Sequence, residues 1–431
     1  MTRFEYPRLV LSDPAGDIID HPSLKLLGRS GDRFLIPQPS ELIPLPLGSQ
    51  LFTLPGRVPV GWDEKENAFA SVKKAKIGRK EMDSTAVASF LPPGFIRTLL
   101  PATRPGLKLP ILPLWAYSAV GWKDGKFWAT GLLIDSNPHW NPKYFQNDRL
   151  LKRKVDTFLR KNPSNRLFRQ LAKCALEYHC FAGTNVFYRR WECPLPTSPS
   201  CNAHCLGCLS LQSSDGCLAS HERIHFVPTV EEVIDVALPH LQEAEDAIIS
   251  FGQGCEGEPL VQWRLLEKVI LKVRGKTDRG TINLNTNGSF PRQLKRLCDA
   301  GLDSVRVTLN SPHPKYYRRY HRPKSYTFRQ VLDSLILAKE EGIYTSINLL
   351  IFPGFTDREE EVEGLIGLIQ KTRIDLIQMR NLNIDPDFYL SSVGGGKGIG
   401  ISKMIDILKE EFPSLQFGYF NRTKENFYPN G

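Results

Sequence analysis

The sequence of 431 residues lacks a long hydrophobic run. Residues 1–30 contain no apolar core of the kind found in signal peptides. The most apolar stretch, residues 109–122, is interrupted by Pro110 and Pro113 and is too short to cross a bilayer. We therefore expect a soluble, cytoplasmic protein with no membrane partner.

The sequence also lacks an internal repeat and any long low-complexity tract. Hydrophobic residues make up 41% of the chain, which is enough for a packed globular protein. The chain is too long for one ordinary small core. These observations indicate either two domains or one large α/β domain with an extension.

Cysteine is present in an odd number, nine, and the residues are clustered locally. In a reducing compartment, this pattern favours metal ligands and buried thiols over a disulfide framework. Cys201, Cys205 and Cys208 have the spacing C-x₃-C-x₂-C. This compact triplet is the feature most typical of a metal centre.

Two kinds of metal centre agree with the triplet. Structural zinc sites usually use two ligand pairs. No second pair stands at the usual distance here, although Cys193, Cys217 or His204 could supply a fourth ligand. Three thiolates in one loop can also hold three irons of a cuboidal iron–sulfur cluster and leave the fourth iron open. The spacing favours the cluster and leaves zinc as the alternative.

The formal net charge of +10 is unevenly distributed. Residues 149–170 carry eight basic residues and one acid, and residues 313–324 form a second basic run that contains tyrosines. Such runs indicate either an anionic partner, such as RNA or a phosphorylated substrate, or solvated helix faces. No recognisable nucleic-acid-binding module accompanies them, so both interpretations stay open.

The chain divides into three stretches with different sequence patterns. Residues 1–135 contain short apolar runs separated by proline and glycine, with a hairpin predicted over residues 115–135. Residues 147–180 have helical periodicity, interrupted at residues 162–165. Beyond residue 184, strands and helices alternate. We expect four parts: a β-rich N-terminal domain (1–145), a basic helical connector (146–183), an α/β domain (184–395) and a helix–strand extension (396–431).

The alternation predicts a parallel sheet covered by helices. Strands are expected over 185–196, 246–252, 281–288, 304–311, 344–354 and 376–385, and helices over 265–275, 290–301, 327–342 and 357–371. A further helix (402–411) and a short strand (417–420) end the chain. About six βα units are fewer than the eight of a complete barrel. The predicted fold class is therefore α/β, a partial (β/α)₆ TIM-like barrel with a β-rich N-terminal extension.

Several of the predicted strands are unusually polar for a sheet covered on both faces. By the period of two, their polar side chains share faces. Burying so many amides without partners would cost several kcal/mol, so one side of the sheet is expected to meet a polar ligand or water. The shared faces are Asn283, Asn285 and Asn287 in one strand; Arg306, Thr308 and Asn310 in the next; Ser346 and Asn348 in the third; and Arg380 in the last.

The cysteine triplet and three later stretches together resemble the radical S-adenosylmethionine (radical SAM) superfamily. CEGEPL (255–260) resembles the family's GGEP motif, and LNTNG (284–288) resembles its TNG strand end. VRVTLNS (305–311) and NLLIFPG (348–354) resemble strands that contact the ribose and carboxylate of the cofactor. The resemblance covers roughly residues 190–390.

The resemblance implies a definite chemistry. A 4Fe–4S cluster on Cys201, Cys205 and Cys208 would bind S-adenosylmethionine (SAM) at its open iron. One electron from reduced flavodoxin or ferredoxin would cleave the sulfonium, and the resulting 5′-deoxyadenosyl radical would abstract hydrogen from a substrate. The implied cofactor-binding residues are Glu256, Gly257, Glu258, Pro259, Asn285, Asn287, Thr308, Asn310, Asn348 and Arg380.

The sequence departs from the family pattern at two positions. Gly207 stands before the third cysteine, where the family often has an aromatic residue near the adenine, so adenine packing must come from elsewhere. Glu256 replaces the first glycine of GGEP and puts a carboxylate near the expected cofactor amine, either as an ion-pair partner or pointing into solvent.

Missing cysteines and motifs also reduce the number of family branches that the sequence could resemble. No cysteine follows Cys298, which disfavours branches with C-terminal clusters and the branch that methylates RNA through a C-terminal cysteine. No cobalamin-binding motif is present. A second cluster on Cys174, Cys180, Cys193 and Cys217 would have no known spacing, and the question stays open.

Three functions remain in competition. The first is radical SAM chemistry on a small molecule or cofactor precursor, and the basic helix 149–170 favours an anionic one. The second is the same chemistry on RNA or a peptide, and the third is zinc-dependent nucleic-acid binding without catalysis. The N-terminal extension is expected to cap the barrel or to present the substrate.

Overall fold

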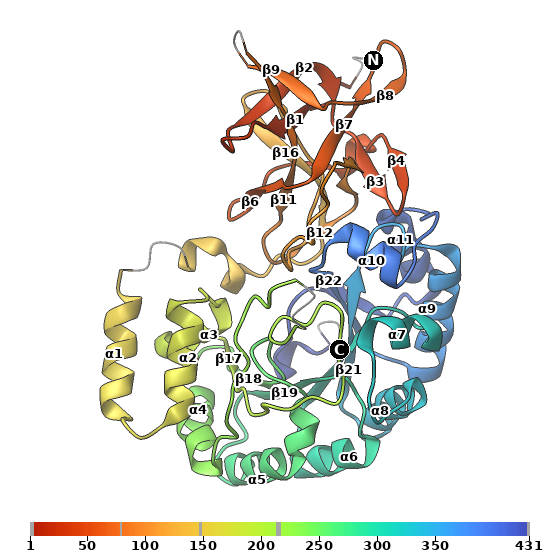
Figure 1. Cartoon of the computed structure of the whole chain (residues 1–431). Coiled ribbons are helices and arrows are strands. Elements are labelled where there is room, and N and C mark those ends of the chain that lie inside the picture. Colours follow the sequence, from red (N-terminus) through yellow and green to blue (C-terminus); the bar gives the residue numbers. More distant parts are fainter. Residues whose placement is uncertain (1–3, 78–79, 146–148, 213–216, 429–431) are drawn as a thin grey trace.

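The computed structural model describes residues 4–77, 80–145, 149–212 and 217–428, and its two halves have different architectures (Figure 1). Antiparallel strands dominate the N-terminal part, and a curled parallel sheet with helices outside it forms the rest. Within these ranges, no helix combines the length and the apolar character needed to cross a membrane. The predicted α/β fold class, a partial barrel with a β-rich N-terminal extension, is confirmed.

Among its described residues, the N-terminal part contains sixteen short strands, most of them in an eleven-stranded sheet. The predicted hairpin is present, because β15 pairs with β16 around the turn at Asp124 and Gly125, both of which have positive φ. The strands are β1 (Arg8–Ser12), β2 (Ile18–Lys25), β3 (Gly28–Ser30), β4 (Arg33–Leu35), β5 (Leu42–Pro44), β6 (Gln50–Leu54), β7 (Arg57–Asp63), β8 (Ala68–Ser71), β9 (Lys74–Ile77), β10 (Lys80–Asp83), β11 (Thr85–Phe90), β12 (Phe95–Arg97), β13 (Leu100–Pro101), β14 (Thr103–Pro105), β15 (Val120–Lys123) and β16 (Lys126–Leu133).

A helical connector follows, and residues 146–148, where it was predicted to begin, lie outside the described residues. The expected break at residues 162–165 separates α1 (Leu151–Lys161) from α2 (Arg166–Leu176). The prediction of a strand over 185–196 is wrong in its first half, because α3 (Phe181–Tyr188) continues the helical layer. Phe187 packs edge-on against Phe158 of α1, with ring centroids 5.5 Å apart, so tertiary packing overrides local strand preference.

The parallel sheet has seven strands in sequence order, and every neighbouring pair is parallel. The six predicted strands are present, and the short strand predicted near the C-terminus joins them as the seventh. They are β17 (Glu192–Pro194), β18 (Ile248–Phe251), β19 (Thr281–Thr286), β20 (Ser304–Leu309), β21 (Tyr344–Ile351), β22 (Leu376–Asn381) and β23 (Gln416–Gly418).

Helices cover the outer face of this sheet, and the main hydrophobic core lies between the two layers (Figure 1). Val305, Val307 and Leu309 alternate with polar residues along β20, so its apolar side chains face the helices. The helices are α4 (Val230–Glu243), α5 (Trp263–Arg274), α6 (Pro291–Ala300), α7 (Pro314–His321), α8 (Phe328–Glu340), α9 (Glu359–Thr372), α10 (Pro386–Ser392) and α11 (Ile401–Glu411). Of these, α4, α7 and α10 were not predicted.

The N-terminal part is fastened to the carboxyl ends of β21 and β22 by buried charged groups. Arg57 forms an ion pair of 2.6 Å with Asp385, and both side chains are at most 3% exposed. The Asp385 carboxylate also accepts a hydrogen bond of 2.7 Å from the Leu112 N–H. Arg97 donates to the carbonyls of Ile351 and Leu382. These contacts fix the N-terminal part at the end of the barrel where the polar strand ends meet.

Candidate functional site

A cavity of about 520 Å³ opens at the carboxyl ends of the parallel strands. Three groups of residues line it: the cysteine loop, the strand ends predicted to be polar, and aromatic residues from the connector and the C-terminal extension. Parallel α/β folds place their ligand sites at this end of the sheet. The cavity is therefore the candidate active site.

The cysteine loop (201–208) rests on α7 through backbone hydrogen bonds. The N–H groups of His204 and Leu206 donate to the carbonyls of His321 and Tyr320, both at 3.0 Å. The Cys205 Sγ lies 3.3 Å from the His321 Nδ1. Backbone pairing of this kind holds the loop in place independently of any metal.

The three thiols suit a cluster better than a single ion. Cys201, Cys205 and Cys208 all line the cavity, yet their Sγ atoms do not all lie within 4.8 Å of one another. A tetrahedral zinc with bonds of about 2.3 Å needs closer sulfurs, whereas a multi-iron cluster joins more widely spaced ones. Burial raises the pKa of Cys201 to about 11, so binding of a metal would release protons.

Glu256 fastens the entrance of the cysteine loop to the end of β18. Its carboxylate accepts hydrogen bonds from the N–H groups of Thr197, Ser198, Gly252 and Gln253, at 2.7 to 3.0 Å, and from the Thr197 hydroxyl at 3.2 Å. Burial raises the pKa of Glu256 to about 7 against the lowering effect of these bonds. The side chain is buried, so the expectation that it points into solvent is wrong, while an ion pair with the cofactor amine stays a prediction.

Gly257 lies close to the start of the cysteine loop, and Glu258 bonds to the end of the neighbouring strand, β19. A Cβ on Gly257 would lie 2.0 Å from the Ser200 carbonyl, so only glycine permits this close approach. The Glu258 carboxylate accepts hydrogen bonds from the Thr286 hydroxyl and from the N–H groups of Leu260 and Asn287. Burial raises its pKa to about 7.

The structure brings most of the predicted strand residues to the cavity. Thr308 accepts a hydrogen bond of 3.2 Å from the Asn348 amide, whose own Oδ1 is buried without a partner. Such an orphaned acceptor suits a polar ligand in the cavity. The predicted residues that line the cavity are Glu256, Gly257, Glu258, Pro259, Asn285, Asn287, Thr308, Asn348 and Arg380.

Asn310 is the exception among the predicted cofactor contacts, since it does not line the cavity. Its amide donates to the Tyr316 carbonyl at 3.3 Å and to the Tyr389 hydroxyl at 3.4 Å, outside the lumen. Asn283 also stays outside the cavity and bonds Ser250, Asn285 and Ser304. The period of two identified the face but not where along each strand the cavity begins and ends.

Two arginines also line the cavity, Arg306 on β20 and Arg380 on β22. Arg306 donates to Gln378 and Asn421, but its Nε is buried without a partner. The Nε of Arg380 is also unpartnered, and its guanidinium lies 4.1 Å from the ring centre of Tyr419. Burial, reinforced by the charge of Arg380, lowers the pKa of Arg306 to about 9.

Three cavity residues near the thiols were missed. Arg223 donates to the Cys208 Sγ at 3.3 Å, and no sequence motif pointed to it. Tyr320 and His321 lie in the basic run 313–324, which was noted only for its charge. A Cβ on Gly207 would lie 2.8 Å from the Tyr320 hydroxyl, so this ring occupies the space beside the third cysteine from another element.

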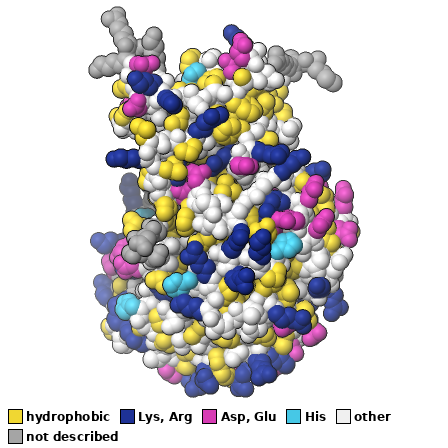
Figure 2. Space-filling view, turned by 45° about the vertical axis from the view of Figure 1, so that its right-hand side comes forward, with side chains coloured by type: hydrophobic (Ala, Val, Ile, Leu, Met, Phe, Trp, Pro, Cys, Tyr) yellow, Lys and Arg dark blue, Asp and Glu magenta, His cyan; other side chains and the backbone are white. Residues whose placement is uncertain are grey.

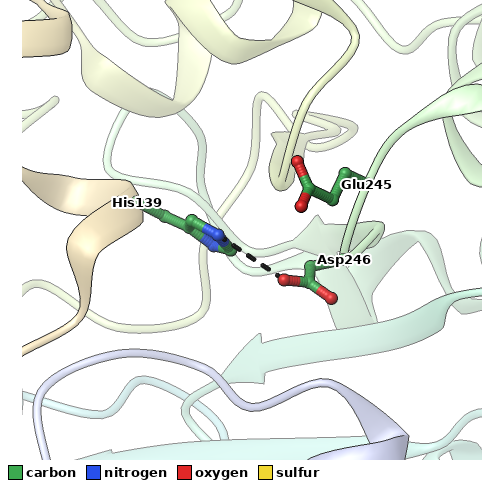
Figure 3. A group of neighbouring side chains, drawn as sticks. All are labelled: His139, Glu245 and Asp246. Carbon is green, nitrogen blue, oxygen red and sulfur yellow. Dashed lines mark ion pairs between the residues drawn. The ribbon is translucent and has the colours of Figure 1, made fainter.

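Within the described residues, the remaining cysteines do not converge in threes at the spacing that a single metal ion needs. In the part of the chain that the structure describes, three possible ligands converge only at His139, Glu245 and Asp246, on the surface (Figure 3). His139 stacks on Trp191 with ring centroids 4.5 Å apart, and its Nε2 lies 3.5 Å from the Asp246 carboxylate. A surface ion pair accounts for this arrangement.

Comparisons with known proteins agree with the site. Residues 195–366 match the model of the radical SAM superfamily. A GTP 3′,8-cyclase of Aquifex aeolicus (strain VF5) is 30% identical over 161 residues, covering 36% of this chain and 47% of that protein. A GTP 3′,8-cyclase of Alkaliphilus oremlandii (strain OhILAs) is 28% identical over 217 residues, covering 49% and 62%. The chain thus spans about half the length of these relatives.

Solved structures are similar at lower identity. The hydrogenase maturase HydG from Carboxydothermus hydrogenoformans matches with a TM-score of 0.37 and 19% identity, over 62% of this chain and 69% of that one. Methylornithine synthase matches with a TM-score of 0.39 and 14% identity, over 64% and 77%. Members of the matched family bind a 4Fe–4S cluster and SAM, and they generally need a one-electron donor. Residues 195–366, which match the family model, are therefore identified as a radical SAM domain.

Proposed function

We propose that the protein reductively cleaves SAM at a 4Fe–4S cluster and abstracts hydrogen from a small-molecule substrate. The observation that carries this proposal is the placement of three thiols, too widely spread for a single ion, on the wall of a polar cavity at the carboxyl ends of parallel strands. Cys201, Cys205 and Cys208 would hold the cluster. The cluster would supply the electron that breaks the sulfonium bond.

The surrounding residues would bind and orient the cofactor. Glu258 lies beside the cysteine loop and would face the methionyl ammonium. Asn285 and Asn287 would contact polar groups of the cofactor, and the orphaned Asn348 Oδ1 would accept a hydrogen bond beside Thr308. Tyr320 would supply the aromatic surface that Gly207 lacks. Fixed dipoles of this kind position a charged ligand and exclude water.

Anaerobic reconstitution tests the proposal directly. The wild type should bind about four irons per chain and form 5′-deoxyadenosine from SAM with dithionite. Cys205→Ala should abolish that product, while Cys298→Ala, at a cysteine outside the cavity, should retain it. Colourless protein with one zinc per chain would refute the proposal and support the zinc-binding alternative.

The substrate is proposed to be anionic, because two of the arginines that line the cavity keep unpartnered donors. Arg306 and Arg380 each leave a buried Nε unbonded, and a guanidinium in that state is costly unless an anion pairs with it. Glu192, a carboxylate that also lines the cavity, is already bonded to the Ser250 hydroxyl and the Asn421 amide, both at 2.7 Å. Two guanidiniums suit a phosphate group particularly well.

A purine nucleotide is the specific candidate within that class. The relatives named GTP 3′,8-cyclase favour it, and the same cavity is lined by the aromatic rings of Trp140, Phe181 and Phe420, on which a planar base could stack. RNA and peptides remain the alternative substrates for the same chemistry.

Equilibrium binding to the reconstituted protein tests the substrate class. GTP and inorganic pyrophosphate should bind, and Arg380→Gln should weaken both roughly tenfold, since a lost charged hydrogen bond costs about 1.5–3 kcal/mol. Arg380→Lys should restore part of the affinity. If pyrophosphate fails to bind, or if Arg380→Gln weakens SAM instead, the anionic-substrate proposal is wrong.

The finer assignments of the whole chain are also proposals. We propose the four domains with boundaries at residues 145, 183 and 395, with the N-terminal part closing the cavity end of the barrel through the Arg57–Asp385 and Arg97 contacts. We propose reduced flavodoxin or ferredoxin as the electron donor and the cytoplasm as the location, where all nine cysteines would stay reduced, as they are free here.

A further inference from the structure

The outer surface of α7 and the three residues that follow it carry five exposed cations and no acid. They are Lys315, Arg318, Arg319, Arg322 and Lys324, which we call the α7 basic patch. Figure 2 shows Lys and Arg side chains gathered on this side of the barrel. Like charges crowded on one short helix repel one another, so a partner of opposite charge would stabilise them.

Most of these cations are not neutralised within the chain. No ion pair or side-chain hydrogen bond joins Arg318, Arg322 or Lys324 to any described residue. Arg319 donates only to the Val393 carbonyl, at 3.0 Å. The nearest acidic side chain on α9, Glu360, is paired with Arg358 at 2.8 Å. The patch therefore presents its charge to solvent.

The same helix supports the cysteine loop from behind. Its His321 and Tyr320 carbonyls accept the two loop hydrogen bonds at 3.0 Å, and the Lys324 N–H donates to the Asn202 carbonyl at 2.9 Å. The thiol ligand Cys205 contacts His321 directly. One helix thus separates the proposed cluster from the charged surface, while Pro93 of the N-terminal part lines another side of the cavity.

We propose that the α7 basic patch is the docking surface for an acidic electron-carrier protein that reduces the cluster. The inference rests on the proposed function, since only a redox cluster needs such a partner. Electron transfer weakens steeply with distance, and α7 carries three of the cations as well as the carbonyls and the His321 ring that contact the cysteine loop. Opposite charges would steer the carrier to it and orient it there.

Charge reversal with two reductants tests the docking site. The double variant Arg318→Glu/Arg322→Glu should form 5′-deoxyadenosine at least about tenfold more slowly with reduced flavodoxin, and at the wild-type rate with dithionite, which needs no docking surface. The matched control is Lys152→Glu/Arg153→Glu on α1, an equal charge change at exposed residues on the opposite side of the barrel. It should leave both rates unchanged.

Salt and direct electron transfer complete the test. Raising the salt concentration should slow the flavodoxin-driven reaction of the wild type and spare the dithionite-driven one. Equal flavodoxin rates in variant and wild type, or equal losses with both reductants, would overturn the docking site. Oxidation of flavodoxin by the cluster, followed by stopped-flow absorbance, separates this outcome from failure of the proposed function, because it does not require SAM cleavage. RNA that binds the wild type but not the double variant, without an effect on flavodoxin, would reassign the patch to nucleic acid.

Discussion

The two ends of the cavity differ in how completely the protein itself provides hydrogen-bond partners for their charged side chains. At the cysteine end, Glu256 accepts five hydrogen bonds and Glu258 accepts three, all from the protein itself. At the arginine end, Arg306 and Arg380 keep buried nitrogen atoms without partners. One end is internally satisfied, and the other still needs a ligand.

This difference separates two tasks. A cofactor used in every turnover is best received by groups held rigidly in advance, because no reorganisation is then required. A substrate that must enter and leave can instead supply the missing partner of a charged side chain, so its binding is specific for charge. We therefore propose that the cysteine end binds the cofactor and the arginine end binds the substrate, and the following experiments test that division.

The largest effect is expected from Glu256→Ala. The substitution leaves four backbone N–H groups without their acceptor, which should lower the free energy of unfolding by about 3 kcal/mol or more. Iron retention after gel filtration should fall strongly as the loop loosens. Glu192→Ala, at the arginine end, removes only two hydrogen bonds and should retain its iron. Equal iron loss in the two variants would contradict the division.

A smaller effect is expected in the pH dependence of stability. Burial raises the pKa of Glu256 from 4.5 to about 7. Between pH 4.5 and about 7, the folded apoprotein therefore keeps a proton on Glu256 that the unfolded chain releases. The stabilisation that this proton provides is fully present below about pH 4.5 and is lost as the pH rises to 7. The stability difference between wild type and Glu256→Gln should fall by at most about 1.4 kcal/mol per pH unit in this window. Urea denaturation at pH 5, 6, 7 and 8 measures it, and a constant difference would refute the shift.

The role of Glu256 also marks the limit of prediction from the sequence. The C-x₃-C-x₂-C spacing and the βα alternation are local patterns; the predicted sheet is confirmed, and the three cysteines line the cavity. That Thr197 and Ser198 pass within hydrogen-bonding distance of Glu256 depends on tertiary contacts that no local pattern contains. Asn310 was misplaced for a similar reason, since periodicity defines a face but not the depth of a cavity.

At the cysteine end, Arg223 should raise the midpoint potential of the cluster. Its guanidinium donates to the Cys208 Sγ at 3.3 Å, and a positive charge with a hydrogen bond to sulfur stabilises the reduced, more negative cluster. Arg223→Gln should lower the midpoint potential, on the order of tens of millivolts. A redox titration followed by electron paramagnetic resonance measures this. Arg306→Gln, at the other end, should change it less, and an equal change would show that the two ends are not electrically distinct.

The smallest effect concerns the close contact between Gly207 and Tyr320. A methyl group at Gly207 would lie 2.8 Å from the Tyr320 hydroxyl and 3.1 Å from the Asn383 carbonyl. Gly207→Ala should therefore destabilise the protein by about 1–3 kcal/mol through overpacking and weaken SAM binding. Adding Tyr320→Phe removes the hydroxyl, which is the nearer of the two contacts, so the double variant should recover part of the lost stability. Because the carbonyl remains in place, recovery should be incomplete; no recovery would mean that the backbone contact, and not the tyrosine, requires glycine beside the third cysteine.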